Sequence, residues 1–483
     1  MEQSTYALVQ DFYELTMAGG YLEQGFEEKI VYFDLFYRTI PDHGGYVVSS
    51  GLEQVINYLT KLSFTKEEIA FLRSKQLFSE LFLEYLSTFS FTGELYAMKE
   101  GTLCFPYEPI LTVKAPLIEA QLVESFLLLT VNHQSLIATK ASRMKFVAKE
   151  KKILEFGTRR AHGKDASVYG ARAAYIGGVD GTSNVEADYQ FGVPALGTMA
   201  HSWIQMFDTE YEAFLAYAKQ YPYQTTLLVD TYHVLESGIP NAIKVFKEIQ
   251  VPLGIKNYGI RIDSGDLSYL SKQARKMLDD AMLQDCKITV SNSLDEFLLT
   301  SLLDDGAPID SFGIGEKLIT SASSPVFGGV YKLVAVEDQG KIIPKIKLSE
   351  NPEKVTLPSF KQVYRFIDKL SKKAIGDVIT LYDEVIDTEK PYRLFDPLYP
   401  WKEKNVSQYE AIPLLELKIS KGKLVNDLPS ITTIRKYVEE QKALMWDEVL
   451  RLNNPQKYIV DYSEKLYQLK SDLIIEMSTK SLK

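Results

Sequence analysis

The middle of the chain combines two hydrophobic patterns. Short apolar runs end in Gly, Thr, Ser, Asp, Arg or His, and helical spacing of apolar residues follows most of them. The apolar runs lie at 154–160, 177–184, 193–201, 225–232, 258–265, 287–292 and 309–315. The helical segments lie at 203–220, 239–250 and 268–283. They are long enough to connect parallel strands. The pattern predicts an α/β protein with an irregular TIM-like (β/α) barrel and polar residues at one open face.

Other patterns flank this region and predict two further domains. The N-terminal elements are expected as helices at 5–24, 51–85 and 119–147 and as strands at 30–38, 93–98, 101–106 and 109–116. The C-terminal elements are expected as strands at 375–382 and 411–419 and as helices at 432–452 and 461–477. A strand at 331–336 and a polar stretch at 347–354 precede them. We therefore predict an N-terminal α/β domain at 1–136, the barrel at 137–346, and a C-terminal α+β domain at 347–483.

Composition narrows the function classes. A chain of 483 residues, 46% of them hydrophobic, can build two or three cores. The formal charge of −10 argues against a broad nucleic-acid-binding surface but allows a local basic pocket for a phosphorylated metabolite. Cys104 and Cys286 are far apart, which argues against a disulfide scaffold or a zinc site. Without a signal-like N-terminus or an apolar run of about 18 residues, we expect a cytoplasmic protein away from membranes.

Charged and aromatic residues stand at the ends of three apolar runs. Phe156 and Arg159 belong to Phe-Gly-Thr-Arg-Arg, and Asp230 ends Leu-Leu-Val-Asp. In Gly-Ile-Arg-Ile-Asp, strand alternation places Arg261 and Asp263 on the same side. Such charges at a barrel mouth require a ligand, a metal ion or mutual pairing. We therefore predict a binding site there, with a buried ion-pair network as the structural alternative.

The last two runs carry small residues that suit phosphate binding. Gly313 and Gly315 would let backbone N–H groups approach an anion, and Ser291 and Asn292 precede a helix N-terminus. Barrels often hold phosphate at the loops after their last two strands. We therefore predict that these four residues bind phosphate.

Three further candidates each have a structural alternative. His201 begins a helix directly after an apolar run, where it is either catalytic or a structural histidine. Tyr13 lies in an early helical pattern, where a core aromatic is the simpler interpretation. Arg38 ends the strand predicted at 30–38, where it either binds an anion or is solvated.

Taken together and in order, these motifs resemble the nicotinate phosphoribosyltransferase family. The resemblance covers Asp-Phe-Tyr-Glu-Leu-Thr-Met at 11–17, Glu-Phe-Gly-Thr-Arg-Arg-Ala-His-Gly at 155–163, Gly-Thr-Ser-Asn at 181–184, Gly-Thr-Met-Ala-His-Ser at 197–202, Arg-Ile-Asp-Ser-Gly-Asp at 261–266 and Phe-Gly-Ile-Gly at 312–315. It implies an irregular barrel between two other domains and a head-to-tail homodimer with active sites at the subunit interface.

The resemblance also implies a reaction. Nicotinate and phosphoribosyl pyrophosphate would give nicotinate mononucleotide and pyrophosphate in NAD biosynthesis, with Mg²⁺ present. ATP hydrolysis would be coupled through a phosphohistidine, for which His201 is the candidate. Asp230 and Asp263 would stabilise the positive charge at the ribose and hold Mg²⁺. The Gly313–Gly315 turn would hold the ribose 5′-phosphate.

Further residues would bind the pyridine substrate and pyrophosphate. Phe156 and the partner subunit's Tyr13 would sandwich the ring, and Arg261 would bind the carboxylate through its planar fork. Arg159 would lie near the same substrate or its phosphates. The partner subunit's Arg38 would touch pyrophosphate.

Two competing interpretations remain open. A nicotinamide-using relative would share most motifs, but we expect Asp at position 183, where this chain has Ser183. A carboxylate there would repel the substrate carboxylate, so Ser183 favours the acid. A non-catalytic phosphosugar-binding protein would tolerate the loss of the candidate catalytic residues, yet all are present. One departure from the family is Ser359, where we expect Gly.

Overall fold

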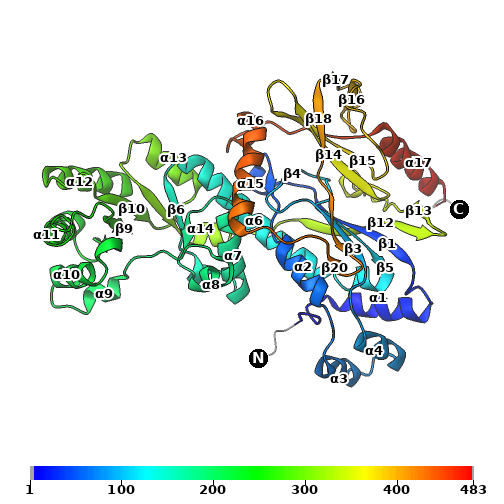
Figure 1. The fold of residues 1–483 in the computed structure, drawn as a ribbon, viewed down its shortest axis with the longest axis horizontal. Helices are drawn as coiled ribbons and strands as arrows, with labels where there is room; N and C mark the ends of the chain where they lie inside the picture. Colours follow the sequence, from blue (N-terminus) through cyan, green and yellow to red (C-terminus); the bar gives the residue numbers. More distant parts are fainter. Residues whose placement is uncertain (1–4, 481–483) are drawn as a thin grey trace. The chain divides into compact units, whose positions relative to one another are not determined.

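The computed structural model describes residues 5–480, which form two compact units (Figure 1). One unit comprises Met1–Leu136 together with Val326–Lys483, and the other comprises Ile137–Pro325. We call them the split unit and the central unit. The boundary at 136/137 lies within helix α6 (Glu124–Ala148). The domain limits expected from the sequence stay predictions.

The central unit is built on a six-stranded parallel sheet in the order β7-β6-β11-β10-β9-β8. The strands are β6 (Lys152–Glu155), β7 (Gly181–Thr182), β8 (Thr226–Leu228), β9 (Gly259–Ile262), β10 (Lys287–Ser291) and β11 (Ser311–Ile314). Within the described residues, no pairing joins the outer strands β7 and β8. Most strand residues are buried, as expected for a parallel sheet covered on both faces. The predicted α/β class is confirmed.

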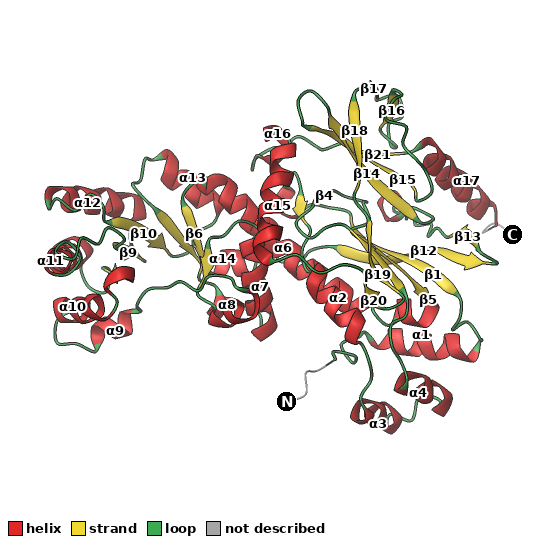
Figure 2. Ribbon diagram, in the orientation of Figure 1, coloured by secondary structure: helices red, strands yellow, loops and turns green. Residues whose placement is uncertain are grey.

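Helices follow these strands and flank the sheet (Figure 2). The α-helices are α7 (Lys164–Ile176), α8 (Val185–Phe191), α9 (His201–Gln205), α10 (Glu210–Gln220), α11 (Ile239–Glu248), α12 (Leu267–Asp280), α13 (Glu296–Asp304) and α14 (Glu316–Ile319). Short helical turns lie at Thr158–Arg160, Pro222–Gln224 and Val234–Gly238. Helix α12 packs on β9 and β10, whereas α7 and α8 contact β7.

Two expected elements of this unit differ. The run at 193–201 is not a strand, because its pairing is limited to an isolated bridge between Thr182 and Ala195. Pro194, which cannot donate to a ladder, precedes that bridge. The helix expected at 203–220 is two helices, α9 and α10. Thr209 begins α10 with a capping box that includes Glu212, so a new helix starts there.

The split unit contains a seven-stranded antiparallel sheet in the order β13-β12-β1-β5-β3-β19-β20 and a four-stranded sheet in the order β18-β14-β15-β21. The strands of the first are β1 (Ile30–Tyr37), β3 (Glu94–Ala97), β5 (Leu111–Pro116), β12 (Gly329–Asp338), β13 (Lys341–Pro344), β19 (Glu416–Ser420) and β20 (Lys423–Leu424). Those of the second are β14 (Lys361–Asp368), β15 (Ala374–Leu381), β18 (Tyr409–Pro413) and β21 (Val460–Tyr462). Two-stranded sheets pair β2 (Val47–Val48) with β4 (Leu103–Cys104) and β16 (Tyr392–Phe395) with β17 (Glu403–Val406).

Helices of the split unit cover these sheets. They are α1 (Phe12–Glu23), α2 (Leu52–Lys61), α3 (Lys66–Ser74), α4 (Glu80–Ser87), α5 (Leu117–Gln121), α15 (Ile431–Leu444), α16 (Asp447–Leu450) and α17 (Glu464–Lys480), with single turns at Pro41–His43 and Pro352–Lys354. Helix α5 contacts β1 and β5, and α1 packs on α5. The expected strand at 411–419 is instead β18 and β19, which belong to different sheets.

A buried ion pair joins segments of this unit that are distant in the sequence. Lys361 Nζ lies 2.8 Å from Asp34 Oδ2 and also donates to the carbonyls of Leu357 and Pro358. It also donates to the carbonyl of Ser359, whose φ of 71° is in the left-handed region. That φ gives a physical reason for the glycine expected at 359.

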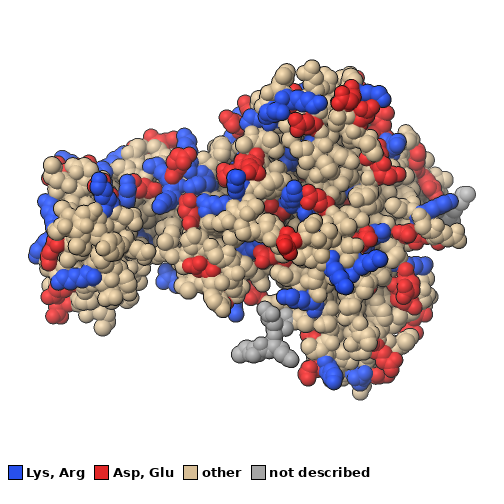
Figure 3. Space-filling model, viewed as in Figure 1, with Lys and Arg blue, Asp and Glu red and all other residues tan. Residues whose placement is uncertain are grey.

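Charged side chains of both signs are present on the surface. On the face shown in Figure 3, Lys and Arg are interspersed with Asp and Glu. No helix within residues 5–480 is long and apolar enough to cross a membrane. Cys104 and Cys286 are both buried and unpaired.

Candidate active site

Arg261 and Asp263 form the centre of the candidate site in the central unit. Arg261 is the third residue of β9, and Asp263 follows the strand directly. Arg261 Nη2 lies 2.9 Å from Asp263 Oδ1. The expectation that alternation places the two side chains on one side is therefore confirmed.

The Arg261 guanidinium is held by neighbouring strand ends. Its Nε donates to Ser291 Oγ at 2.8 Å, and its Nη1 donates to Thr198 Oγ1 at 3.0 Å. Ser291 Oγ in turn donates to Asp263 Oδ1. A guanidinium has five N–H donors, and the bonds to described residues use one on each nitrogen. One N–H therefore remains on each terminal nitrogen, and two guanidinium N–H groups can bind a carboxylate in bidentate fashion.

An aromatic ring lies against this guanidinium. The Cζ atom of Arg261 is 5.2 Å from the centroid of the Phe156 ring. A Cβ at position 313 would lie 2.7 Å from two carbons of that ring, so Gly313 makes room for Phe156. Gly313 lies within β11 and not in a turn as expected, whereas Gly315 is the N-cap of α14. The close approach of the Phe156 ring explains why glycine suits position 313.

Glu155 and Thr182 hold the ends of β6 and β7 together, and sequence reasoning gave neither a role. Glu155 is buried and accepts from Thr182 Oγ1 at 2.6 Å and from the backbone N–H of Gly157. Burial raises the pKa of the Glu155 carboxyl. The carbonyl of Glu155 accepts from the N–H of Ser183 at 2.8 Å, which leaves the Ser183 side chain exposed near Thr158. Glu155, the acidic residue directly before Phe-Gly, is the one feature of the sequence that could have indicated this interaction.

His201 lies beside this centre at the start of α9. Its Nδ1 is 3.0 Å from Thr231 Oγ1, and its Nε2 is 4.0 Å from Asp263 Oδ2. The side chain is 41% exposed. Thr231 therefore orients the ring so that one nitrogen faces the carboxylate that also binds Arg261. Thr198 and Thr231 were not predicted, because a threonine hydroxyl carries no distinctive sequence signal.

Asp230 completes the group of carboxylates at the strand ends. Its Oδ2 accepts from Ser264 Oγ at 2.6 Å. Its Oδ1 is buried and makes no hydrogen bond to any residue that the structure describes. Among the described residues, no group of three or more His, Cys, Asp or Glu side chains could hold a metal. Two carboxylates suit Mg²⁺ bound partly by substrate oxygens better than they suit a metal held by protein alone.

The other predicted residues are less closely assembled. Arg159 is exposed on the turn at Thr158–Arg160, and Asn292 follows β10 with a left-handed φ of 93°. Tyr13 and Arg38 belong to the split unit. Tyr13 lies on α1, is 44% exposed and hydrogen-bonds Glu124, while Arg38 Nε donates to the carbonyl of Glu353 at 3.0 Å.

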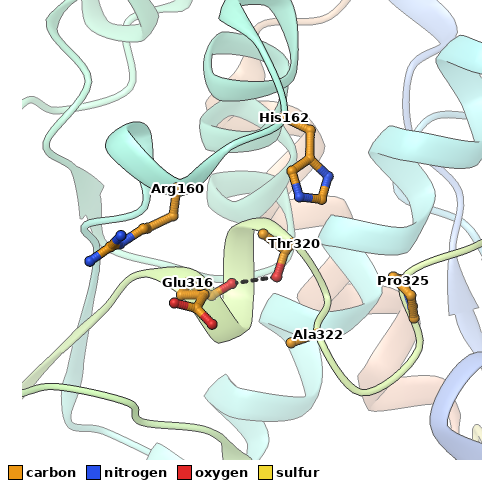
Figure 4. Close-up of a pocket in the computed structure, with 6 residues that line it drawn as sticks. All are labelled: Arg160, His162, Glu316, Thr320, Ala322 and Pro325. Carbon is orange, nitrogen blue, oxygen red and sulfur yellow. Dashed lines mark hydrogen bonds between the residues drawn. The ribbon is translucent and has the colours of Figure 1, made fainter.

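A polar pocket of about 320 Å³ lies near these strand ends, following β6 and β11 (Figure 4). Its lining comprises Arg160, His162, Glu316, Thr320, Ala322 and Pro325. Figure 4 shows the His162 ring directed toward α14, which carries Glu316 at its start. None of these six residues was predicted as a site residue.

Family models match three stretches of the chain. Residues 8–132 match the nicotinate phosphoribosyltransferase (NAPRTase) N-terminal domain, residues 151–370 match the NAPRTase family, and residues 360–470 match the nicotinate phosphoribosyltransferase C-terminal domain.

Full-length relatives give the same result. The chain is 46% identical to a nicotinate phosphoribosyltransferase of Bacillus subtilis over 98% of this chain and 96% of that protein. It is 32% identical to the Homo sapiens protein of that name over 96% of each chain. The crystal structure of human nicotinic acid phosphoribosyltransferase superimposes with a TM-score of 0.84 at 30% identity, covering 96% of this chain and 99% of that one.

Proposed function

Because the chain belongs to the nicotinate phosphoribosyltransferase family, we propose that it transfers a phosphoribosyl group from phosphoribosyl pyrophosphate to the ring nitrogen of nicotinate. The products are nicotinate mononucleotide and pyrophosphate, as a step in NAD biosynthesis. The observation that carries this proposal is the Arg261 guanidinium, which lies on the Phe156 ring with one unused N–H on each terminal nitrogen.

Nicotinate recognition follows from this pair. The pyridine ring stacks on Phe156, and its carboxylate takes the two remaining N–H groups of Arg261. The exposed hydroxyl of Ser183 brings no negative charge to the pocket. A carboxylate at 183 would instead favour an amide substrate, so the acid is the expected one. Arg159, on the turn that follows Phe156, contacts the same substrate or its phosphates.

The positive charge that develops at the sugar makes the main contribution to the energy barrier of the transfer. Departure of pyrophosphate builds positive charge at the anomeric carbon, and the carboxylates of Asp230 and Asp263 stabilise it. The unpaired Oδ1 of Asp230 supports a ligand at this place. Mg²⁺, when bound with these carboxylates, would offset the charge of the leaving pyrophosphate. Asp263 also keeps Arg261 oriented through their 2.9 Å ion pair.

The ribose 5′-phosphate binds at the ends of β10 and β11. Asn292 and Ser293, which follow β10, have left-handed φ angles of 93° and 50°. Successive backbone N–H groups in turns of this kind can bind an anion. Ser291 adds a hydroxyl, and the Gly313–Gly315 segment allows the sugar phosphate to approach the backbone.

ATP use is assigned to His201. The imidazole is partly exposed, and Thr231 holds its Nδ1, which leaves Nε2 as the phosphoryl acceptor. Phosphorylation at Nε2 would bring negative charge next to Asp263, 4.0 Å away, and so change the electrostatics of the sugar site.

We further propose a head-to-tail homodimer, in which the partner subunit's Tyr13 covers the second face of the pyridine and the partner subunit's Arg38 contacts pyrophosphate. The exposed ring of Tyr13 on α1 supports this arrangement.

Steady-state assays test the proposal. Purified protein should convert nicotinate in preference to nicotinamide, and His201→Asn should abolish ATP hydrolysis and acid-labile phosphate incorporation while slower ATP-independent transfer persists. Absence of nicotinate turnover would favour a binding protein. Stoichiometric labelling of the variant by γ-labelled ATP would remove His201 from the phosphoryl step.

A further inference from the structure

The pocket beside Gly315 is built by the loops after two adjacent strands. Strands β6 and β11 pair in parallel, so the segments that follow them lie side by side. The first segment supplies Arg160 and His162, and the second supplies Glu316 and Thr320 (Figure 4). The pocket therefore opens at the same sheet edge as Phe156.

Arg160 supplies the positive charge of this pocket. Neither Arg160 nor His162 has an ion pair or a side-chain hydrogen bond with the part of the chain that the structure describes, and both are exposed. Arg261 differs, because Asp263 lies 2.9 Å from it. Glu316 is the one carboxylate among the lining residues. A pocket lined by an unpaired guanidinium favours an anion.

Buried interactions fix the shape of the pocket wall. Lys140 Nζ lies 2.8 Å from Glu296 Oε1 and donates to Ser323 Oγ at 2.6 Å, and this ion pair is almost fully buried. Ser323 follows Ala322, which lines the pocket. In the same segment, Thr320 Oγ1 donates to the carbonyl of Glu316 at 2.7 Å. A wall held in this way costs little to organise when a ligand binds.

We propose that this pocket binds a polyphosphate chain, with Arg160 and His162 as donors to the phosphate oxygens. The proposal rests on the function proposed above, whose substrates carry a diphosphate and a triphosphate. A volume of about 320 Å³ exceeds the needs of a single phosphate ion and lies at the low end for ligand pockets. Glu316 fits the same ligand, because Mg²⁺ commonly joins one carboxylate to substrate phosphates.

Calorimetric titration of inorganic pyrophosphate into the full-length protein, with and without MgCl₂, tests the site without relying on turnover. Arg160→Gln should weaken pyrophosphate binding about tenfold or more, because a charged hydrogen bond is lost. Lys256→Gln is the matched control: it removes one positive charge from an exposed position in the same unit and should leave the Kd within about twofold. Circular dichroism should show both variants folded.

A parallel titration with a non-hydrolysable ATP analogue distinguishes the two sources. Weakened pyrophosphate binding, with displacement by phosphoribosyl pyrophosphate, assigns the pocket to the diphosphate. Weakening of the ATP analogue alone assigns it to the triphosphate. Unchanged affinity of Arg160→Gln for both ligands overturns the pocket assignment. If that protein still converts nicotinate, the proposed function stands without it.

Discussion

At the scale of single residues, the candidate site depends on how hydrogen-bond donors are distributed around Arg261. Three neighbours occupy one donor on each nitrogen, and two donors are left for a ligand. Arg261→Lys keeps the charge but has no planar fork, so the KM for nicotinate should rise about tenfold or more. Steady-state kinetics at saturating phosphoribosyl pyrophosphate measure this. An unaltered nicotinate KM would remove Arg261 from the carboxylate site.

Glu14 provides a second prediction, outside the site. It is fully buried at the start of α1, its Oε1 accepts from Ser125, and its Oε2 makes no hydrogen bond within residues 5–480. Burial raises its pKa to about 7 from an ordinary value of 4.5. The folded protein therefore holds a proton that the unfolded chain releases, so stability falls as pH rises from about 4.5 to 7. The loss amounts to about 3 kcal/mol at most.

Glu14→Gln should remove this loss, since the amide oxygen still accepts from Ser125 and no charge forms. Thermal unfolding at pH 5 and pH 8 measures the effect. From pH 5 to pH 8, the unfolding midpoint of the variant should rise relative to that of the wild type. If the midpoints of the two proteins differ by the same amount at pH 5 and pH 8, Glu14 does not titrate in this window.

The site residues that could be predicted from the sequence are charged or have an unusual backbone conformation. The pairing of Arg261 with Asp263 followed from strand alternation. Thr198, Thr231 and Glu155 were missed, because their roles depend on side chains from other elements. Only the folded sheet brings them together.

At the scale of elements, the loop between β13 and β14 shows how one residue can strain a turn. Ser359 has a φ of 71°, and the N–H of Ser359 donates to Val334 O at 2.8 Å, so the conformation is fixed. A left-handed non-glycine residue costs roughly 1–2 kcal/mol. Glycine also adds unfolded-state entropy, so Ser359→Gly should stabilise the protein by about 0.5–1 kcal/mol.

Urea unfolding of Ser359→Gly against Ser359→Ala isolates this effect. Alanine removes the hydroxyl but keeps the Cβ, so it should remain near the wild-type midpoint. If alanine stabilises as much as glycine, the hydroxyl and not the backbone is responsible.

Elements whose apolar residues follow a clear helical or strand period were predicted better than elements whose position depends on pairing with a distant segment. Strands β8 to β11 and helices α11 and α12 lie where the apolar pattern placed them, so their assignment as strands and helices is confirmed. Strand β14, however, was not predicted. The antiparallel register of Val31 with Val336 could not be predicted either, because it joins segments that lie far apart in the sequence.

At the scale of the whole molecule, the proposed shared active sites can be tested by mixing subunits. Tyr13→Ala and Arg261→Ala should each be nearly inactive. If Tyr13 acts across the interface, hybrids of the two variants contain one site with both native residues, so activity should reappear after mixing and dissociation–reassociation. Each variant treated alone is the control. Mixtures no more active than their parents would place both residues in the same subunit's site.

The close approach of Gly313 to Phe156 has a consequence for how this sequence can change over time. Gly313 lies on β11 and Phe156 directly follows the neighbouring strand β6, and a Cβ at 313 would lie 2.7 Å from the ring. A methyl group at 313 becomes acceptable only after a smaller side chain has replaced the ring. That replacement removes the stacking surface for the pyridine. Descendants that retain the ring are therefore confined to glycine at 313, and lineages that lose the ring become free to vary there.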